Sequence, residues 1–130
     1  MEKTILGDNL EICRILNGMW QVAGGHGQID SELAIQDMEK YQELGFTTWD
    51  LADIYGPAES LIGKFSKKIK QNFQAFTKFV PNPGPMSSSI VTHYIDESLK
   101  KMNADCIDLL QFHWWDYQDS SYLDALQHLS

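Results

Sequence analysis

Four polar residues lie at or just after the ends of successive predicted strands and could together supply a proton. Asp50 closes the strand-like run 47–50, and Tyr55 follows in the next loop. Lys78 lies near the end of the run 73–80, and His113 closes the run 106–113. If the strands are parallel, their carboxyl ends share one face, where (β/α) barrels carry their chemistry. An acid, a phenol, an ammonium and an imidazole gathered there would form a general-acid assembly.

The elements that must position these residues alternate along the chain. The runs 4–6 and 10–14 flank Gly7-Asp8-Asn9, which has hairpin-turn chemistry, and an apolar run leads on through 18–22 as a further short strand. The stretch 23–27 reads as a loop. Strands are then predicted at 46–50, 73–80 and 106–113, and helices follow Asp30-Ser31, Pro57 and Ser87–Ser89. A fourth helix is predicted in the tail, with Tyr122, Leu123, Leu126 and Leu129 on one stripe. This plan is a hairpin and then about four (β/α) units, which predicts one domain over 1–130, with a parallel sheet in strand order and helices on one face. The hairpin is expected at the strands' amino ends.

Composition excludes several classes of protein. Hydrophobic residues make up 43% of the chain and charged residues 22%, as in a globular domain. The net charge of −8 disfavours a nucleic-acid or anionic-membrane partner. No apolar run approaches the ~20 residues of a membrane span, and the first residues lack the plan of a signal peptide. Two isolated cysteines, Cys13 and Cys106, fit a reducing compartment, so we expect a cytoplasmic protein.

Three motifs in order resemble the aldo-keto reductase family. They are the stretch Asp50–Glu59 with its Asp, Ala, Tyr-Gly and Glu, the pair Thr77-Lys78, and the segment Asp108–Trp114. The resemblance spans nearly the whole chain from Gly18 onward, with departures at Met19 and Leu51, where family members often have Thr. It implies an α/β fold, a partial (β/α)8 TIM barrel. A complete barrel takes about 250 residues, so this chain would supply the capping hairpin and the first half.

The resemblance implies NADPH-dependent reduction of an aldehyde or ketone by hydride transfer. Hydride addition leaves negative charge on the carbonyl oxygen, which a donor must meet. Tyr55 is expected to donate the proton. A free phenol is a reluctant acid, so the Lys78 ammonium would favour the phenolate while Asp50 holds that lysine. His113 is expected to hydrogen-bond and orient the substrate oxygen.

The same resemblance implies where the cofactor and the substrate would bind. Gly18, Met19, Trp20 and Asp50 are the expected cofactor-binding residues for NADP. Trp20 and Trp114 are expected to wall an apolar pocket for a small carbonyl substrate. No metal site is expected. The family's contacts to the 2′-phosphate lie in the half that this chain does not supply.

Other interpretations stay open. Taken singly, Asp50 would be a cap, Lys78 a surface lysine, and His113 a core histidine; together, and in order, they favour a site. A second hypothesis is a catalytically inactive half-barrel that serves as an interaction module or a gene remnant. A third is a metal-dependent hydrolase using Asp50, His113 and Asp116, which the lack of any His-x-His disfavours. No role is predicted for His26, His93 or His128.

A half-barrel also has consequences for association. It leaves two edge strands unpaired, and we expect the apolar residues Trp49, Phe76, Leu110 and Phe112 to face solvent from its inner side. Open edges and large apolar patches drive association. The 130-residue chain alone is therefore expected to self-associate, edge to edge, or to be poorly soluble. It is also expected to bind NADPH weakly or not at all and to have negligible reductase activity.

Overall fold

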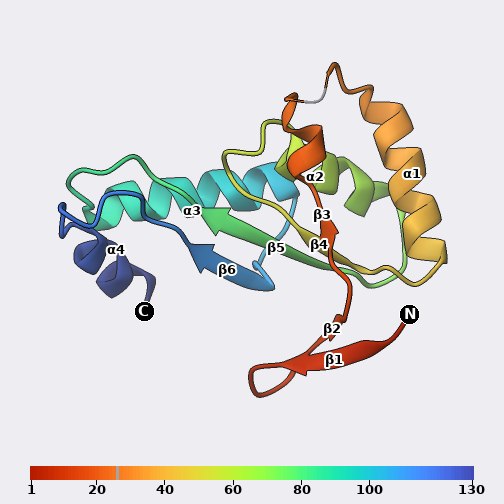
Figure 1. Ribbon diagram of the computed structural model, residues 1–130, viewed down its shortest axis with the longest axis horizontal. Helices are drawn as coiled ribbons and strands as arrows, with labels where there is room; N and C mark the ends of the chain where they lie inside the picture. The colour runs from red at the N-terminus through yellow and green to blue at the C-terminus, as the bar shows by residue number, and fades with distance from the viewer. Residues whose placement is uncertain (26) are drawn as a thin grey trace.

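The computed structural model describes residues 1–25 and 27–130. Of the predicted loop 23–27, His26 lies outside the described residues. The chain forms a hairpin, β1 (Lys3–Leu6) and β2 (Leu10–Cys13), and then alternates strands with helices (Figure 1). The remaining elements are β3 (Asn17–Gly18), the short 3-10 helix η1 (Trp20–Ala23), α1 (Ser31–Glu43), β4 (Thr48–Asp50), α2 (Ala58–Lys68), β5 (Gln74–Phe79), α3 (Ser88–Met102), β6 (Leu109–Phe112) and α4 (Tyr122–Leu129).

The sheet confirms the predicted topology. Four strands pair in the order β3-β4-β5-β6, and every pairing between them is parallel. The hairpin forms a separate antiparallel pair. It joins the sheet at the strands' amino ends, because the amide of Cys13 donates to Thr48 Oγ1 (3.0 Å) and the amide of Thr47 donates to Cys13 Sγ (3.3 Å). The carboxyl ends of all four strands consequently share the opposite face.

Two helices begin at the capping residues that the sequence predicts. The Asp30 carboxylate accepts from the amides of Glu32 and Leu33, which starts α1. The Ser87 hydroxyl accepts from the amide of Ile90, which starts α3. Each side chain satisfies amides that a helix leaves unpaired in its first turn.

Two predicted strands differ from the structure. The run 18–22 is strand only to Gly18; the Met19 amide still donates to the Asp50 carbonyl (2.9 Å), and the Val22 amide then bonds to the Met19 carbonyl (3.2 Å), which closes a 3-10 turn. The run 106–113 is strand only over Leu109–Phe112, because the Asp108 carboxylate, not a backbone carbonyl, accepts from the Ala75 amide (2.8 Å). Asp50 and Lys78 still lie at the carboxyl ends of β4 and β5, and His113 directly follows β6.

All four helices pack on one face of the sheet. Trp49 and Ala75 lie in an apolar cluster with residues of α1 and α2, and Phe79 lies in a second cluster with residues of α3 and α4. Helices α2 and α3 approach closely at Gly63, where an added Cβ would overlap the Lys101 carbonyl oxygen. A glycine is therefore required for this approach.

The inner face of the sheet corrects one expectation. Successive residues of a strand point to opposite faces. Trp49, Leu110 and Phe112 point toward the helices, not toward solvent on the inner side, and Phe76 points inward but is buried. The inner face instead carries hydrogen-bonded polar side chains: Thr48, Asp50, Gln74, Lys78 and Gln111. The prediction of an exposed apolar inner face was wrong.

Candidate active site

Lys78 and Asp50 form a two-pronged ion pair on adjacent strands. The Lys78 Nζ lies 2.8 Å from both Asp50 carboxylate oxygens and donates a further bond to the Leu51 carbonyl (2.7 Å). Both side chains are largely buried, with 15% of Lys78 and 26% of Asp50 exposed. An ammonium has three protons, and each has an acceptor here. Strands β4 and β5 therefore fix the position and the direction of the charge.

Tyr55 lies beside this ammonium. The Lys78 Nζ is 5.0 Å from the centroid of the Tyr55 ring, within the range of a cation–π contact. Trp20 also meets Tyr55 edge-on, with ring centroids 5.1 Å apart. Gly56 has φ +51° and passes close to η1, where an added Cβ would lie 3.2 Å from the Ala23 carbonyl oxygen. This close approach holds Tyr55 against the segment that carries Trp20.

His113 reaches the same place from β6. Its amide donates to the Phe79 carbonyl (2.9 Å), so the residue is still held against β5 after the strand ends. Its imidazole stacks on Trp115, with ring centroids 4.2 Å apart and planes at 31°. The ring is thereby fixed over the carboxyl edge of the sheet.

A cavity of about 280 Å³ lies between these side chains. Its lining comes from the carboxyl end of β5 and from segments that follow the strands: Trp20, Ile54, Tyr55, Lys78, Val80, His113 and Trp115. Three of the four predicted catalytic side chains line it, and Asp50 lies next to it through Lys78. The predicted meeting of these residues at the carboxyl ends of the strands is what the structure shows, and their catalytic roles stay a prediction.

The prediction that Trp114 walls the substrate pocket is wrong, because its side chain points to the other face of the sheet. Trp114 is buried in the cluster with Phe112 and Tyr122, and its indole Nε1 donates to the Asp116 carbonyl (2.7 Å). Trp115 lines the cavity in its place. Side chains alternate along an extended chain, so Trp115 shares the face of His113 and Trp114 shares that of Phe112. This alternation could have identified Trp115 from the sequence.

Gln111 is a further site residue that sequence reasoning missed. Its amide Nε2 donates to Asp50 Oδ1 (3.1 Å), so the carboxylate that holds Lys78 is itself held from β6. Gln111 lies two residues before His113, and the same alternation places both on one face.

Two carboxylates lie behind the cavity and tie the Tyr55 loop to β5. Asp53 Oδ2 accepts from the Val80 amide (3.0 Å), and the Asp53 amide donates to the Lys78 carbonyl (3.1 Å). Glu59, which is buried, accepts from the Thr77 hydroxyl (2.8 Å) and lies 3.6 Å from the Lys101 Nζ. Burial raises the pKa of Asp53, as does the nearby Glu59 charge, while the Val80 amide opposes this.

Three of the predicted cofactor-binding residues, Gly18, Met19 and Trp20, lie in different surroundings. An added Cβ at Gly18 meets no atom within 4 Å. Met19 turns its side chain into the core, and its amide bonds to the Asp50 carbonyl. Trp20 is half-exposed and lines the cavity. Of these three residues only Trp20 lines the cavity, whereas Gly18 and Met19 line a separate groove between β3 and α1. In the described part of the chain, Lys78 is the one lysine or arginine on the cavity, and its protons are directed to Asp50 and Leu51.

The described residues offer neither a cluster of metal ligands nor a membrane-spanning helix. Residues 1–25 and 27–130 contain no group of three or more His, Cys, Asp or Glu side chains placed to hold a metal ion. Within the same residues, no helix has both the length and the apolar character that crossing a membrane requires.

Comparison with known proteins settles the family. The family model described as aldo/keto reductase family matches residues 14–130. The chain belongs to this family. It is 34% identical over 131 residues to the 6-dehydroglucose reductase of Agrobacterium fabrum, covering 87% of this chain and 43% of that protein. The relatives are named reductases and dehydrogenases, so the family membership supports an oxidoreductase.

Solved aldo-keto reductases confirm the partial barrel. The thermostable aldo-keto reductase Tm1743, solved with the inhibitor epalrestat, superposes with a TM-score of 0.79 at 25% identity over 98% of this chain and 48% of that one. A Bombyx mori aldo-keto reductase, solved in complex with NADP, gives a TM-score of 0.75 at 21% identity, over 98% of this chain and 45% of that chain. The chain thus spans less than half the length of these relatives.

Proposed function

We propose that this sequence belongs to an enzyme that reduces an aldehyde or ketone carbonyl with NADPH, with Tyr55 as the proton donor. The observation that carries the proposal is the Lys78 ammonium, which Asp50 and Leu51 hold beside the Tyr55 ring at the cavity wall. The activity is proposed for a complete barrel, since the chain spans 43% of its Agrobacterium fabrum relative.

The chain's own residues provide the proton chemistry. NADPH, when bound, would supply the hydride to the carbonyl carbon. The Tyr55 hydroxyl donates a proton to the carbonyl oxygen as negative charge develops there. The fixed Lys78 ammonium stabilises the phenolate that remains. His113, held by its stacking on Trp115, hydrogen-bonds the substrate oxygen and orients it.

The aromatic walls determine what the cavity accepts. Trp20 and Trp115 are exposed by 52% and 62% and flank the cavity from the β3 and β6 sides. A small apolar carbonyl compound between them would displace water from the Tyr55 hydroxyl, which strengthens hydrogen bonding to the developing oxyanion. The cofactor's phosphates would need cations from outside the described residues.

A second candidate is a catalytically inactive half-barrel that acts as an interaction module. It would describe the 130 residues alone, which cover 43% and 48% of two of the relatives. The two candidates differ in cofactor binding, because a closed barrel is expected to bind NADPH and an isolated half is not.

The decisive experiment compares two proteins. One is the 130-residue chain; the other joins residues 1–130 to the carboxyl-terminal half of the Agrobacterium fabrum reductase. NADPH binding is followed by its fluorescence, and turnover by NADPH oxidation with simple aldehydes and ketones. Turnover by the joined protein supports the reductase. If a folded joined protein binds NADPH but reduces no carbonyl compound, the reductase proposal fails.

A further inference from the structure

The described chain exposes more surface than a compact protein of its mass. Its accessible surface is 8032 Å² for 14.9 kDa, whereas a folded monomer of that mass exposes about 7,000 Å². The excess is therefore about 1,000 Å² per chain. Two chains that covered this excess would bury about 2,000 Å², the upper end of a standard protein–protein interface.

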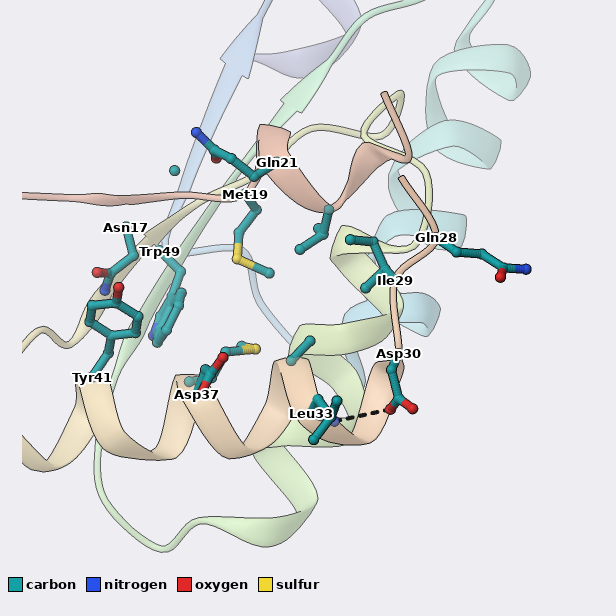
Figure 2. Close-up of a pocket in the computed structure, with 14 residues that line it drawn as sticks. Asn17, Met19, Gln21, Gln28, Ile29, Asp30, Leu33, Asp37, Tyr41 and Trp49 are labelled. Atoms are coloured by element: carbon teal, nitrogen blue, oxygen red, sulfur yellow. Dashed lines mark hydrogen bonds between the residues drawn. The ribbon is translucent and has the colours of Figure 1, made fainter. Parts of the chain in front are cut away.

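Part of this surface is an apolar groove at the β3 edge of the sheet. The groove, of about 630 Å³, lies between β3 and α1 (Figure 2). Met38 and Trp49 are buried at its floor, and Leu33 and Tyr41 line it with 59% and 49% of their surface exposed. Strand β3 pairs only with β4 in the described structure, so its other side is open. The α1 groove therefore borders an unpaired strand.

The β6 edge carries a matching apolar helix surface. At 3.6 residues per turn, Tyr122, Ala125 and Leu129 form one stripe of α4, and this stripe packs on the Phe79–Trp114 cluster. Leu123 and Leu126 form the adjacent stripe. Leu123 exposes 56% of its surface and Leu126 exposes 46%. We name these two residues the α4 stripe. Strand β6 pairs only with β5 among the described residues.

The β3 and β6 edges could pair with each other, because their strands run in the same direction and their helices lie on the same face of the sheet. All four strands are parallel and all helices lie on one side, so α1 and α4 belong to the same layer. The two helices lie at opposite ends of the molecule's longest dimension (Figure 1). A strand added beside β6 would lie below the α4 stripe, and a helix added beside α1 would fill the α1 groove. The β6 edge thus supplies an apolar helix surface, and the β3 edge supplies a groove for it.

We propose that a second copy of this chain occupies both edges and closes an eight-stranded parallel barrel. A two-fold axis along the barrel would place β6 of each copy beside β3 of the other. The α4 stripe of each copy would then fill the α1 groove of the other. Such an interface is isologous and closed, and it leaves no edge of the parallel sheet open. Both candidate active sites would lie on one face of the barrel.

Sedimentation of the 130-residue chain gives the first test. We expect a single species with the mass of two chains at micromolar concentration. A monomer there overturns the proposal and leaves the α1 groove to another occupant, such as further residues of a longer polypeptide. A concentration-dependent series of larger species overturns it as well, because the proposed contacts close after two copies.

Cross-linking tests which surfaces meet. In a Cys106→Ser background, which removes the exposed native thiol, Asp37→Cys places a thiol on the α1 groove and Leu126→Cys places one on the α4 stripe. The two single variants, co-expressed with different tags, should cross-link to each other at least about tenfold more than either does with itself. Equal cross-linking in all three samples, or cross-linking only within one variant, contradicts the geometry.

A charge on the α4 stripe tests its contribution to affinity. Leu126→Asp should weaken the dimer at least about 100-fold, because it places a carboxylate in an apolar contact. Gln71→Asp is the matched control; it adds the same charge at an exposed loop position away from both edges, and it should leave the dimer intact. Circular dichroism checks that both variants fold. A folded Leu126→Asp dimer with unchanged affinity overturns the proposal, and if this variant fails to fold, the cross-linking result decides.

Discussion

Lys78 meets Asp50 through both carboxylate oxygens, each 2.8 Å from the Nζ atom. The pair joins neighbouring strands and is held from a third strand by Gln111. In the proposed mechanism the fixed direction of the ammonium is needed, because a Lys78 turned away from Tyr55 would not stabilise its phenolate. Removing one charge of this pair should therefore lower the free energy of unfolding.

We expect Asp50→Asn to lower the free energy of unfolding by about 1–3 kcal/mol, because it leaves the Lys78 ammonium largely buried without its counter-ion. Urea denaturation of the chain measures this. The control is Glu32→Gln, which breaks the exposed pair with Lys68 and should cost at most about 1 kcal/mol. Equal losses in the two variants would show that Lys78 finds another partner.

Tyr55→Phe tests the proton donor in the joined, complete barrel. The hydroxyl is needed only as charge develops on the substrate oxygen, so turnover should fall by at least ~100-fold while NADPH affinity stays nearly unchanged. Tyr117→Phe removes a hydroxyl from a side chain that is 73% exposed and does not line the cavity, and it should behave as the parent. Turnover within a few-fold of the parent in Tyr55→Phe would assign the donor role elsewhere, with His113 the next candidate.

The sequence predicted the order of elements and the place of the site, because both follow from local signals. Alternating strand and helix patterns, capping by Asp30 and Ser87, and polar residues at strand ends each depend on a few neighbouring residues. The predictions failed where they depended on which face of a strand a side chain points to. Trp114 and Trp115 are neighbours of the same type, and only the alternation counted from His113 separates the cavity from the core.

Long-range contacts were beyond the sequence for a different reason. Nothing local marks Gln111 as the partner of Asp50, or Gly63 as the contact point of α2 with Lys101. These contacts arise only when strands and helices distant in sequence are brought together. The polar inner face was missed in the same way, because Thr48 and Gln74 pair across strands.

Gly63→Ala tests the close approach of α2 and α3. Helix propensity alone favours alanine by about 1 kcal/mol, yet a Cβ here would overlap the Lys101 carbonyl oxygen of the adjacent helix. We expect a net loss of about 1–3 kcal/mol in the free energy of unfolding, since overpacking displaces backbone. In Gly25→Ala the added Cβ meets no atom within 4 Å, and that variant should change stability by less than about 0.5 kcal/mol. A stabilised Gly63→Ala protein would mean that the helices separate freely.

Asp53→Asn tests the buried carboxylate behind the Tyr55 loop through its dependence on pH. Burial raises the pKa of Asp53 above its ordinary value of 3.8, so between the two values the folded state binds more protons than the unfolded state. The contribution of Asp53 to the free energy of unfolding of the parent should therefore fall as pH rises through this window and stay unfavourable at neutral pH. Asparagine cannot ionise, and its side-chain oxygen can still accept from the Val80 amide.

The stability of Asp53→Asn relative to the parent should consequently rise as pH increases from 3.8 through the raised pKa of the folded state, measured by urea denaturation at each pH. Asp119→Asn is the control with the opposite sign, because hydrogen bonds from Ser121 lower the pKa of that exposed carboxyl. Its parent gains stability as pH rises toward 3.8, so the relative stability of the Asp119→Asn variant should fall there. A difference between Asp53→Asn and the parent that stays constant with pH would mean that Asp53 ionises as readily in the folded chain as in the unfolded one.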